Sequence, residues 1–126
     1  MVKILVVEDE PMAQLMIKKF LITLKHEVVT ASSAFEALEK VTEDLNFIFM
    51  DIGLPEGYEA GIDATKKIRA KGGRFSSIPI IALTANKDQE MMIKMIEAGA
   101  NDYLNKPVSL EKLADIIKDL SHPHAA

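Results

Sequence analysis

Residues 47–50 read FIFM, and an aspartate, Asp51, follows them directly. A short run without polar residues predicts a β-strand that is covered on both faces, because a strand with one solvated face alternates polar and apolar residues. A carboxylate beside such a strand is costly to bury, so it needs a partner or a function. Asp51 is therefore the first candidate for a functional residue.

Similar short segments occur on both sides of this strand in the sequence. They are expected to form four more strands, at residues 3–7 (KILVV), 28–31, 79–83 (PIIAL) and 102–104. Segments with apolar residues at helical spacing alternate with them. This alternation predicts an α/β fold, in which one parallel sheet lies between two layers of helices. Ligands of such sheets bind beyond the carboxyl ends of the strands.

Five helices are expected, and most have a recognisable end. The first begins at Pro11, which suits a first helical turn. Its apolar face is expected to contain Met12, Leu15, Met16, Ile17, Phe20, Leu21 and Leu24. Side-chain hydroxyls cap helices well, and Gly often ends them. The second helix is accordingly expected to begin at Ser32 or Ser33, and the fifth at Ser109. The third helix is expected to cover residues 62–70, and the fourth to cover residues 89–98 and to end before Gly99.

Composition narrows the class of protein. The 126 residues suit one domain, expected at residues 1–121 with a tail at 122–126. The net charge of −4 offers no general attraction for nucleic acid. The absence of cysteine excludes disulfides and thiolate chemistry. No apolar run is long enough for a signal peptide or a membrane span, so we expect a cytoplasmic protein with no membrane contact.

Five polar residues should meet at one edge of the sheet, because each comes at the end of a strand: Glu8, Asp9, Asp51, Thr84 and Lys106. Taken singly, each has an ordinary explanation as a helix cap, a strand-end cap or a surface group. Together, three crowded carboxylates raise one another's pKa unless a cation joins them, and Mg²⁺ prefers oxygen ligands. An aspartate can also attack phosphorus, while a lysine and a hydroxyl stabilise phosphoryl oxygens.

Four motifs in this order identify a resemblance: ILVVEDE, FMDIGLP, IPIIALTAN and AGANDYLNKP. The chain resembles the receiver domains of two-component response regulators over residues 3–120. The stretch GIDATKKIR followed by IPIIALTAN looks most like receivers of hybrid sensor histidine kinases. The resemblance implies a flavodoxin-like, doubly wound (βα)5 fold with the strand order 2-1-3-4-5.

The resemblance also implies roles for individual residues. Asp51 would be the phosphoacceptor, and Thr84 and Lys106 would contact the phosphoryl group. Thr84 and Tyr103 would form the switch, and the Lys106–Pro107 peptide bond would be cis, which an X–Pro bond allows at low cost.

A metal site is implied as well. Glu8, Asp9 and Asp51 would bind Mg²⁺ together with the backbone carbonyl of Gly53, with Mn²⁺ as an alternative ion. Glu8 is longer than an aspartate, so it is expected to act through a water and to matter less than Asp9.

Partners follow from the same resemblance. A histidine kinase or a histidine phosphotransfer protein would donate the phosphoryl group. The face formed by the fourth helix, fifth strand and fifth helix would bind an output partner or a second copy. That face is expected to include Met91 and Lys112, and most of Met92, Met95 and Ile96 are expected in the core. The histidines His26, His122 and His124 are expected on the surface.

Other functions fit the sequence less well. A phosphohydrolase that uses an aspartyl phosphate carries a second aspartate two residues after the nucleophile, where this chain has Gly53. A flavodoxin-like binding domain needs a phosphate-cradling loop after the first strand, and residues 8–10 (EDE) would repel phosphate. The complete acidic set argues against a pseudo-receiver used only for docking. We therefore expect a signalling module that catalyses only its own phosphorylation and dephosphorylation.

One departure from the family concerns the loop after Asp51. Receivers usually have a glycine eight residues after the phosphoacceptor, whereas Gly61 stands ten residues after it (61 − 51). The loop at residues 55–61 is therefore expected to be two residues longer than usual, and the sequence leaves its shape beside the site open.

Overall fold

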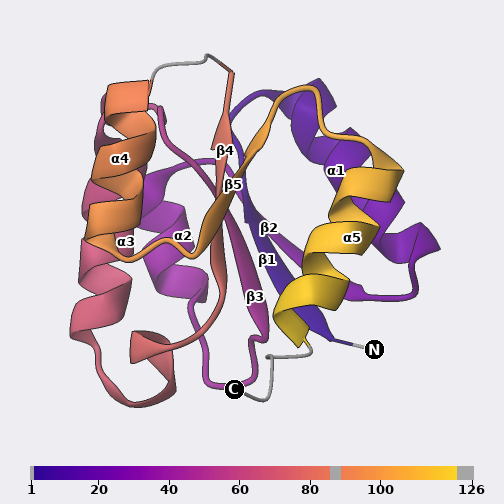
Figure 1. Cartoon of the computed structure of the whole chain (residues 1–126), viewed down its shortest axis with the longest axis horizontal. Helices are drawn as coiled ribbons and strands as arrows, with labels where there is room; N and C mark the ends of the chain where they lie inside the picture. Colours follow the sequence, from indigo (N-terminus) through magenta and orange to yellow (C-terminus); the bar gives the residue numbers. More distant parts are fainter. Residues whose placement is uncertain (1, 86–88, 122–126) are drawn as a thin grey trace.

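The structure is a computed structural model, and it describes residues 2–85 and 89–121. The expected tail at 122–126, with His122 and His124, lies outside the described residues. Five parallel strands form one sheet in the order β2-β1-β3-β4-β5, as expected (Figure 1). The strands are β1 (Lys3–Val7), β2 (Glu27–Ala31), β3 (Phe47–Asp51), β4 (Ile80–Thr84) and β5 (Asp102–Asn105).

Helices cover both faces of the sheet. They are α1 (Pro11–Thr23), α2 (Ala34–Lys40), α3 (Ala60–Ala70), α4 (Gln89–Ala98) and α5 (Leu110–Ser121). Figure 1 shows α1 and α5 on one face and α2, α3 and α4 on the other. The fold class predicted from the alternation of strands and helices is therefore confirmed. No described helix is both long enough and apolar enough to cross a membrane.

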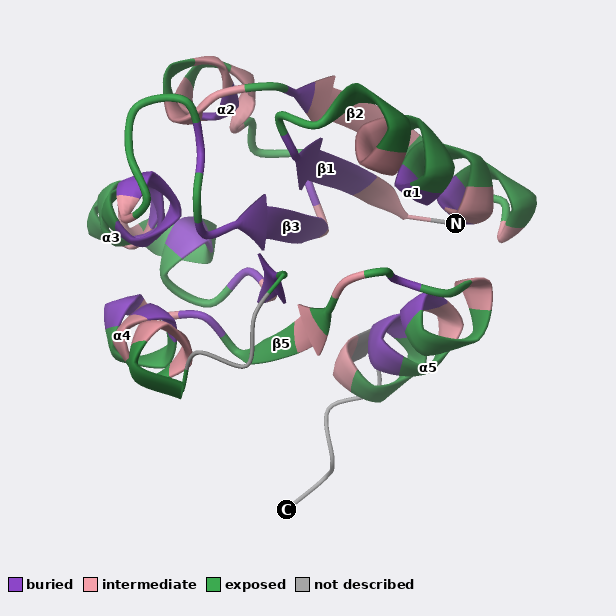
Figure 2. Ribbon diagram, turned by 90° about the horizontal axis from the view of Figure 1, so that it is seen from above, coloured by how far each residue is buried: buried purple, intermediate pink, exposed green. Residues whose placement is uncertain are grey.

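The central strands of the sheet are buried because they contribute to two cores, whereas the edge strand β5 is largely exposed. All five residues of β3 are buried (Figure 2), and side chains along a strand alternate between its two faces. Phe47 and Phe49 pack in the cluster that contains α1 and α5, whereas Ile48 and Met50 pack in the cluster that contains α2, α3 and α4. The absence of polar alternation in FIFM is explained by this double coverage.

Several predicted boundaries differ from the structure by one or two residues. The second strand begins at 27 rather than 28, the fourth covers 80–84 rather than 79–83, the fifth extends to 105, and α3 begins at 60 rather than 62. Pro79 lies outside β4, where it has no N–H to add to the ladder. The segment at residues 71–77, between α3 and β4, contains a short 3₁₀ helix, η1 (Gly73–Ser76), which buries Phe75.

The buried face of α1 is narrower than predicted. Ile17 and Leu21 are buried, but Met12, Leu15 and Met16 are exposed. Residues four apart drift by about 40° around a helix with 3.6 residues per turn, so a long series at that spacing leaves the buried stripe. The caps expected at Ser33, Gly99 and Ser109 are present.

Two predictions about α4 were wrong. Ile96 is 44% exposed instead of lying in the core, and Met91 is half-buried against the core instead of exposed. Met95 is fully buried, as expected, because it is the α4 residue that points most directly at the sheet. His26 was expected on the surface but is half-buried, and its Nδ1 accepts a hydrogen bond from the backbone N–H of Val2.

Candidate functional site

The residues predicted from the strand ends come together at the carboxyl edge of the sheet. Asp9, Asp51, Gly53, Thr84 and Lys106 line one pocket of about 500 Å³. Parallel strands end at the same edge, so residues far apart in sequence meet there. The pocket also contacts residues that the sequence did not point to, namely Ile52, Tyr58, Leu83, Ala85 and Met91.

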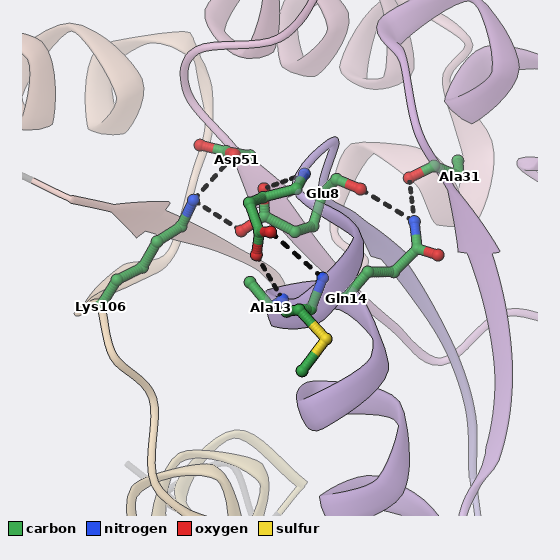
Figure 3. A network of polar contacts seen from close by, with 8 residues as sticks. Glu8, Ala13, Gln14, Ala31, Asp51 and Lys106 are labelled. Carbon is green, nitrogen blue, oxygen red and sulfur yellow. Dashed lines mark hydrogen bonds and ion pairs between the residues drawn. The ribbon is translucent and has the colours of Figure 1, made fainter.

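Lys106 joins the two buried carboxylates of the site. Its Nζ donates a hydrogen bond to Asp51 Oδ2 over 2.8 Å and lies 2.6 Å from Glu8 Oε1 (Figure 3). Glu8 is fully buried and Asp51 is 6% exposed. Lys106 is held in turn by its backbone N–H, which donates to the Thr84 carbonyl, and its bond to Pro107 is cis, as expected.

Burial and charge set the pKa values of this cluster. Burial, together with the hydrogen-bonded carboxyl of Glu8, raises the pKa of Asp51 to about 7, although Lys106 opposes the shift. Burial would also raise the pKa of Glu8, but hydrogen bonds with Asp51 and Lys106 outweigh it and hold that pKa below its usual value. Burial alone would lower the pKa of Lys106, yet the two carboxylates raise it overall. Lys106 is therefore charged, and the acidic pair resists carrying two negative charges.

The carboxylates have the chemistry and spacing of a metal site. Glu8, Asp9 and Asp51 each present a carboxylate oxygen, and these oxygens lie within 4.8 Å of one another. Glu8 Oε1 is buried and lies in close contact with the charged Nζ of Lys106. An all-oxygen set of three close carboxylates fits a hard divalent cation such as Mg²⁺.

Two residues that the sequence did not single out position the acidic pair. Glu10 caps α1, because its carboxylate accepts hydrogen bonds from the backbone N–H groups of Met12 and Ala13. The Nε2 of Gln14 donates to the carbonyls of Glu8 (2.8 Å) and Ala31 (3.2 Å), which ties α1 to the ends of β1 and β2 (Figure 3). An acidic residue directly before Pro11 is a local capping signal, whereas the contacts of Gln14 depend on the fold.

The loop after Asp51 contains a closed turn and a glycine in close contact with the end of β3. Gly61 fits against β3, where its N–H donates to the Ile52 carbonyl over 2.8 Å. Earlier in the loop, Leu54 and Gly57 pair with each other in a turn. Gly61 thus brings the start of α3 against β3 despite the longer spacing in the sequence.

Thr84 and Tyr103 lie on neighbouring strands but in different surroundings. Thr84 is the last residue of β4, is 5% exposed and lines the Asp51 pocket. Tyr103 on β5 is 41% exposed and lines a shallow groove beside α4 with Met92, Ile93 and Ile96. Tyr103 therefore occupies the outward position, and it does not line the pocket.

The fold and the site together define a class: a doubly wound α/β protein whose acidic pocket, with one lysine, suits a phosphoryl group and a divalent cation. A sequence model of the response regulator receiver domain matches residues 4–118. The chain therefore belongs to the response regulator receiver domain family, which serves in two-component phosphorelay signalling.

Similar proteins agree with this assignment. The chain is 34% identical to the hybrid signal transduction histidine kinase L of Dictyostelium discoideum, covering 92% of the chain and 7% of that protein. It is 38% identical to the osmosensing histidine protein kinase SLN1 of Saccharomyces cerevisiae, covering 94% of the chain and 10% of that protein. The chain thus spans about a tenth or less of the length of these relatives.

Solved structures show the same fold. The receiver domain of the sensor histidine kinase PA1611 from Pseudomonas aeruginosa is 34% identical, with a TM-score of 0.84 over 95% of this chain and 98% of that one. That crystal structure has a magnesium ion coordinated in the active site cleft. A CheY-like receiver domain protein from Methanospirillum hungatei is 28% identical, with a TM-score of 0.85 over 97% of this chain and 95% of that one.

Proposed function

We propose that this receiver domain takes a phosphoryl group onto Asp51 from a phosphohistidine on a partner protein, in a reaction that depends on Mg²⁺. The observation that carries the proposal is the position of Asp51 between a cation and further carboxylates. Lys106 Nζ is 2.8 Å from Asp51 Oδ2, and oxygens of Glu8 and Asp9 lie within 4.8 Å of the Asp51 carboxylate.

In the proposed transfer, a carboxylate oxygen of Asp51 forms a bond to phosphorus as the phosphorus–nitrogen bond of the donor breaks. The imidazole of the donor leaves with the electron pair, and an acyl phosphate remains. The Lys106 ammonium neutralises charge on the phosphoryl oxygens, and the hydroxyl of Thr84 can donate a hydrogen bond to one of them. Positioning and charge neutralisation are the main requirements of phosphoryl transfer.

The metal would be held by the side chains of Glu8, Asp9 and Asp51 and by the backbone carbonyl of Gly53. Mg²⁺ supplies positive charge that neutralises phosphoryl oxygens when it is bound, and Mn²⁺ would suit the same oxygen ligands. The magnesium ion in the related Pseudomonas aeruginosa receiver supports this choice of ion. Glu8 also contacts Lys106, so its share in metal binding is expected to be smaller than that of Asp9.

We infer that the chain is a signalling module and that it catalyses only its own phosphorylation and dephosphorylation. A hydrolase that turns over would need an acid or base next to the acceptor, and Gly53 occupies the position two residues after Asp51. The donor would be a histidine kinase or a histidine phosphotransfer protein, in keeping with the hybrid kinases that the chain resembles.

The signal would be read on the face formed by α4, β5 and α5. Tyr103 lies on this face beside α4, and Lys112 on α5 is exposed there. Met91 belongs instead to the pocket and the core, so it is no longer part of the proposed surface. An output partner or a second copy of the chain would bind this face.

Intact mass measurement after incubation with acetyl phosphate and Mg²⁺ tests the function directly. The wild-type chain should gain the mass of one phosphoryl group. Asp51→Asn should not gain this mass at the wild-type rate. If the Asn variant is phosphorylated as fast as the wild type, Asp51 is not the acceptor.

A further inference from the structure

The longer loop between β3 and α3 is attached to α2 by a carboxylate. Leu54, which is buried, exchanges two backbone hydrogen bonds with Gly57 (3.1 and 2.9 Å), so the turn is closed on itself. The two carboxylate oxygens of Glu56, at the tip of this turn, accept hydrogen bonds from the backbone N–H groups of Ala34 and Phe35, each over 3.0 Å. These bonds lower the pKa of Glu56, so it is charged at neutral pH, as its role at the start of a helix requires.

The other end of the loop is attached to α4. The Glu59 carboxylate lies 3.7 Å from Lys94 Nζ, in an ion pair that is about 40% exposed on each side. A pair this exposed contributes little to stability by itself. It nevertheless adds a contact on the opposite side from Glu56. The loop therefore extends from α2 to α4 beside the pocket that contains Asp51.

Tyr58 is the residue of the segment 55–61 that lines the pocket. It lies between the two attached glutamates in sequence, and its side chain is 73% exposed. It lines both the Asp51 pocket and a second groove, formed between α2 and α3, which Phe35 also lines. Its Cα would be only 3.9 Å from a side-chain carbon at Gly53. Tyr58 therefore separates the acceptor pocket from the neighbouring groove, on the side where Gly53 has no side chain of its own.

We propose that Tyr58 determines how readily water reaches phosphorylated Asp51, and that Glu56 is the positioning residue that holds Tyr58 beside the pocket. The proposal rests on the proposed phosphorylation of Asp51. Tyr58 lines one side of the pocket, and the contacts of Glu56 and Glu59 hold the loop on either side of it.

The step that Tyr58 would slow is hydrolysis of the acyl phosphate. The oxygen of a water forms a bond to phosphorus as the bond between phosphorus and the Asp51 oxygen breaks. The carboxylate of Asp51 leaves with the electron pair, and inorganic phosphate carries away the water's oxygen and its protons. A bulky ring at the side of the pocket reduces the space in which that water can approach in line with the leaving oxygen.

The test follows loss of the phosphoryl group by intact mass after acetyl phosphate has been removed. Tyr58→Ala should hydrolyse about threefold faster or more, and Tyr58→Phe should stay within about twofold of the wild type, because shielding depends on the ring rather than the hydroxyl. Phe35→Ala is the matched control, since Phe35 is 70% exposed and lines the neighbouring groove but not the Asp51 pocket. The control should hydrolyse at the wild-type rate.

A double variant tests whether Glu56 acts through Tyr58. Glu56→Ala should also accelerate hydrolysis, while Glu43→Ala, which removes an exposed glutamate elsewhere, should not. If Glu56 serves to position Tyr58, the combined Glu56→Ala and Tyr58→Ala variant should be no faster than Tyr58→Ala alone. A purely stabilising role of Glu56 would instead give effects that multiply.

Several results would overturn the proposal. They are a wild-type hydrolysis rate in Tyr58→Ala, an equal acceleration in Phe35→Ala, and multiplying effects in the double variant. Thermal unfolding of Tyr58→Ala checks that the substitution at this exposed position leaves the fold intact. If the wild-type chain gains no phosphoryl group, the proposed function fails and this proposal fails with it, whereas normal phosphorylation with unchanged hydrolysis rejects this proposal alone.

Discussion

The backbone of Gly61 packs so closely against the backbone of Asp51 that no side chain fits between them. A side-chain carbon at Gly61 would lie 2.0 Å from the Asp51 carbonyl oxygen, far inside van der Waals contact. The start of α3 is thereby held against the end of β3, directly behind the proposed acceptor. The position of α3 and the geometry of the site consequently depend on the same glycine.

Gly61→Ala should destabilise the domain and slow phosphorylation. The added methyl group would force α3 away from β3, and overpacking of this kind costs about 1–3 kcal/mol or more. Urea denaturation monitored by circular dichroism gives the change in the free energy of unfolding. Gly53→Ala is the control, because a side-chain carbon there meets Tyr58 only at 3.9 Å, an ordinary contact. Equal losses of stability in the two variants would show that the close approach at Gly61 is unimportant.

In the metal-free domain, the stability of Asp51→Asn relative to that of the wild type should increase as the pH rises. The pKa of Asp51 is raised to about 7 in the folded state by burial and by Glu8. A carboxyl group whose pKa is higher in the folded state than in the unfolded state stabilises the fold while it is protonated. The wild type therefore loses this stabilisation as the pH rises from about 4 to about 7. Asparagine cannot ionise, so the variant's advantage should grow by roughly 1–3 kcal/mol from pH 5 to pH 8.

Urea denaturation at several pH values in the presence of a chelator measures this difference. Lys106 does not confuse the comparison, because its raised pKa keeps it charged throughout this range. Asp115→Asn, which removes an exposed carboxylate from α5, serves as the control and should show no such trend. A stability difference between Asp51→Asn and the wild type that is the same at pH 5 and pH 8 would contradict the prediction.

Asp9→Asn should weaken Mg²⁺ binding more than Glu8→Gln does. Asp9 is exposed at the pocket, whereas Glu8 is buried and contacts Lys106. Loss of a charged ligand should lower the affinity about tenfold at Asp9 and by a smaller factor at Glu8. Isothermal titration calorimetry of the wild type and both variants measures the dissociation constants for Mg²⁺. Unchanged affinity in both would exclude the metal site.

Phosphorylation should move Tyr103 inward from the outward position that it has in this structure. A phosphoryl group on Asp51 offers acceptor oxygens to the Thr84 hydroxyl, and movement of Thr84 would leave space that the Tyr103 ring can fill. The energy involved should be about 1–3 kcal/mol, the usual scale of such coupling. NMR spectra with and without beryllofluoride, which stands in for the phosphoryl group, should show shifts at Tyr103 and along α4.

Thr84→Ala separates this switch from local effects of the ligand. In that variant the beryllofluoride shifts should stay near Asp51, because the hydroxyl that responds to the phosphoryl group is missing. Shifts that are confined to the Asp51 pocket in the wild type as well, with Tyr103 and α4 unchanged, would exclude the switch.

Much of the architecture was predictable because its signals are local. FIFM and the similar runs identify the strands, and the alternation of strands and helices identifies the layers. The errors occurred where exposure depends on neighbouring elements. Repeated four-residue spacing in α1 suggested a wider buried face than the sheet covers, and Ile96 on α4 is apolar but faces outward.

The sequence by itself determined that an aspartate, a threonine, a lysine and an acidic pair end the strands, and in a parallel sheet those ends share one edge. Only the tertiary structure decided which side chains meet there. It places Lys106 between Glu8 and Asp51, attaches Glu56 to the start of α2, and leaves Tyr58 beside the pocket. Periodicity reports which face of an element is buried, but contacts between side chains depend on distances across the fold that no local pattern contains.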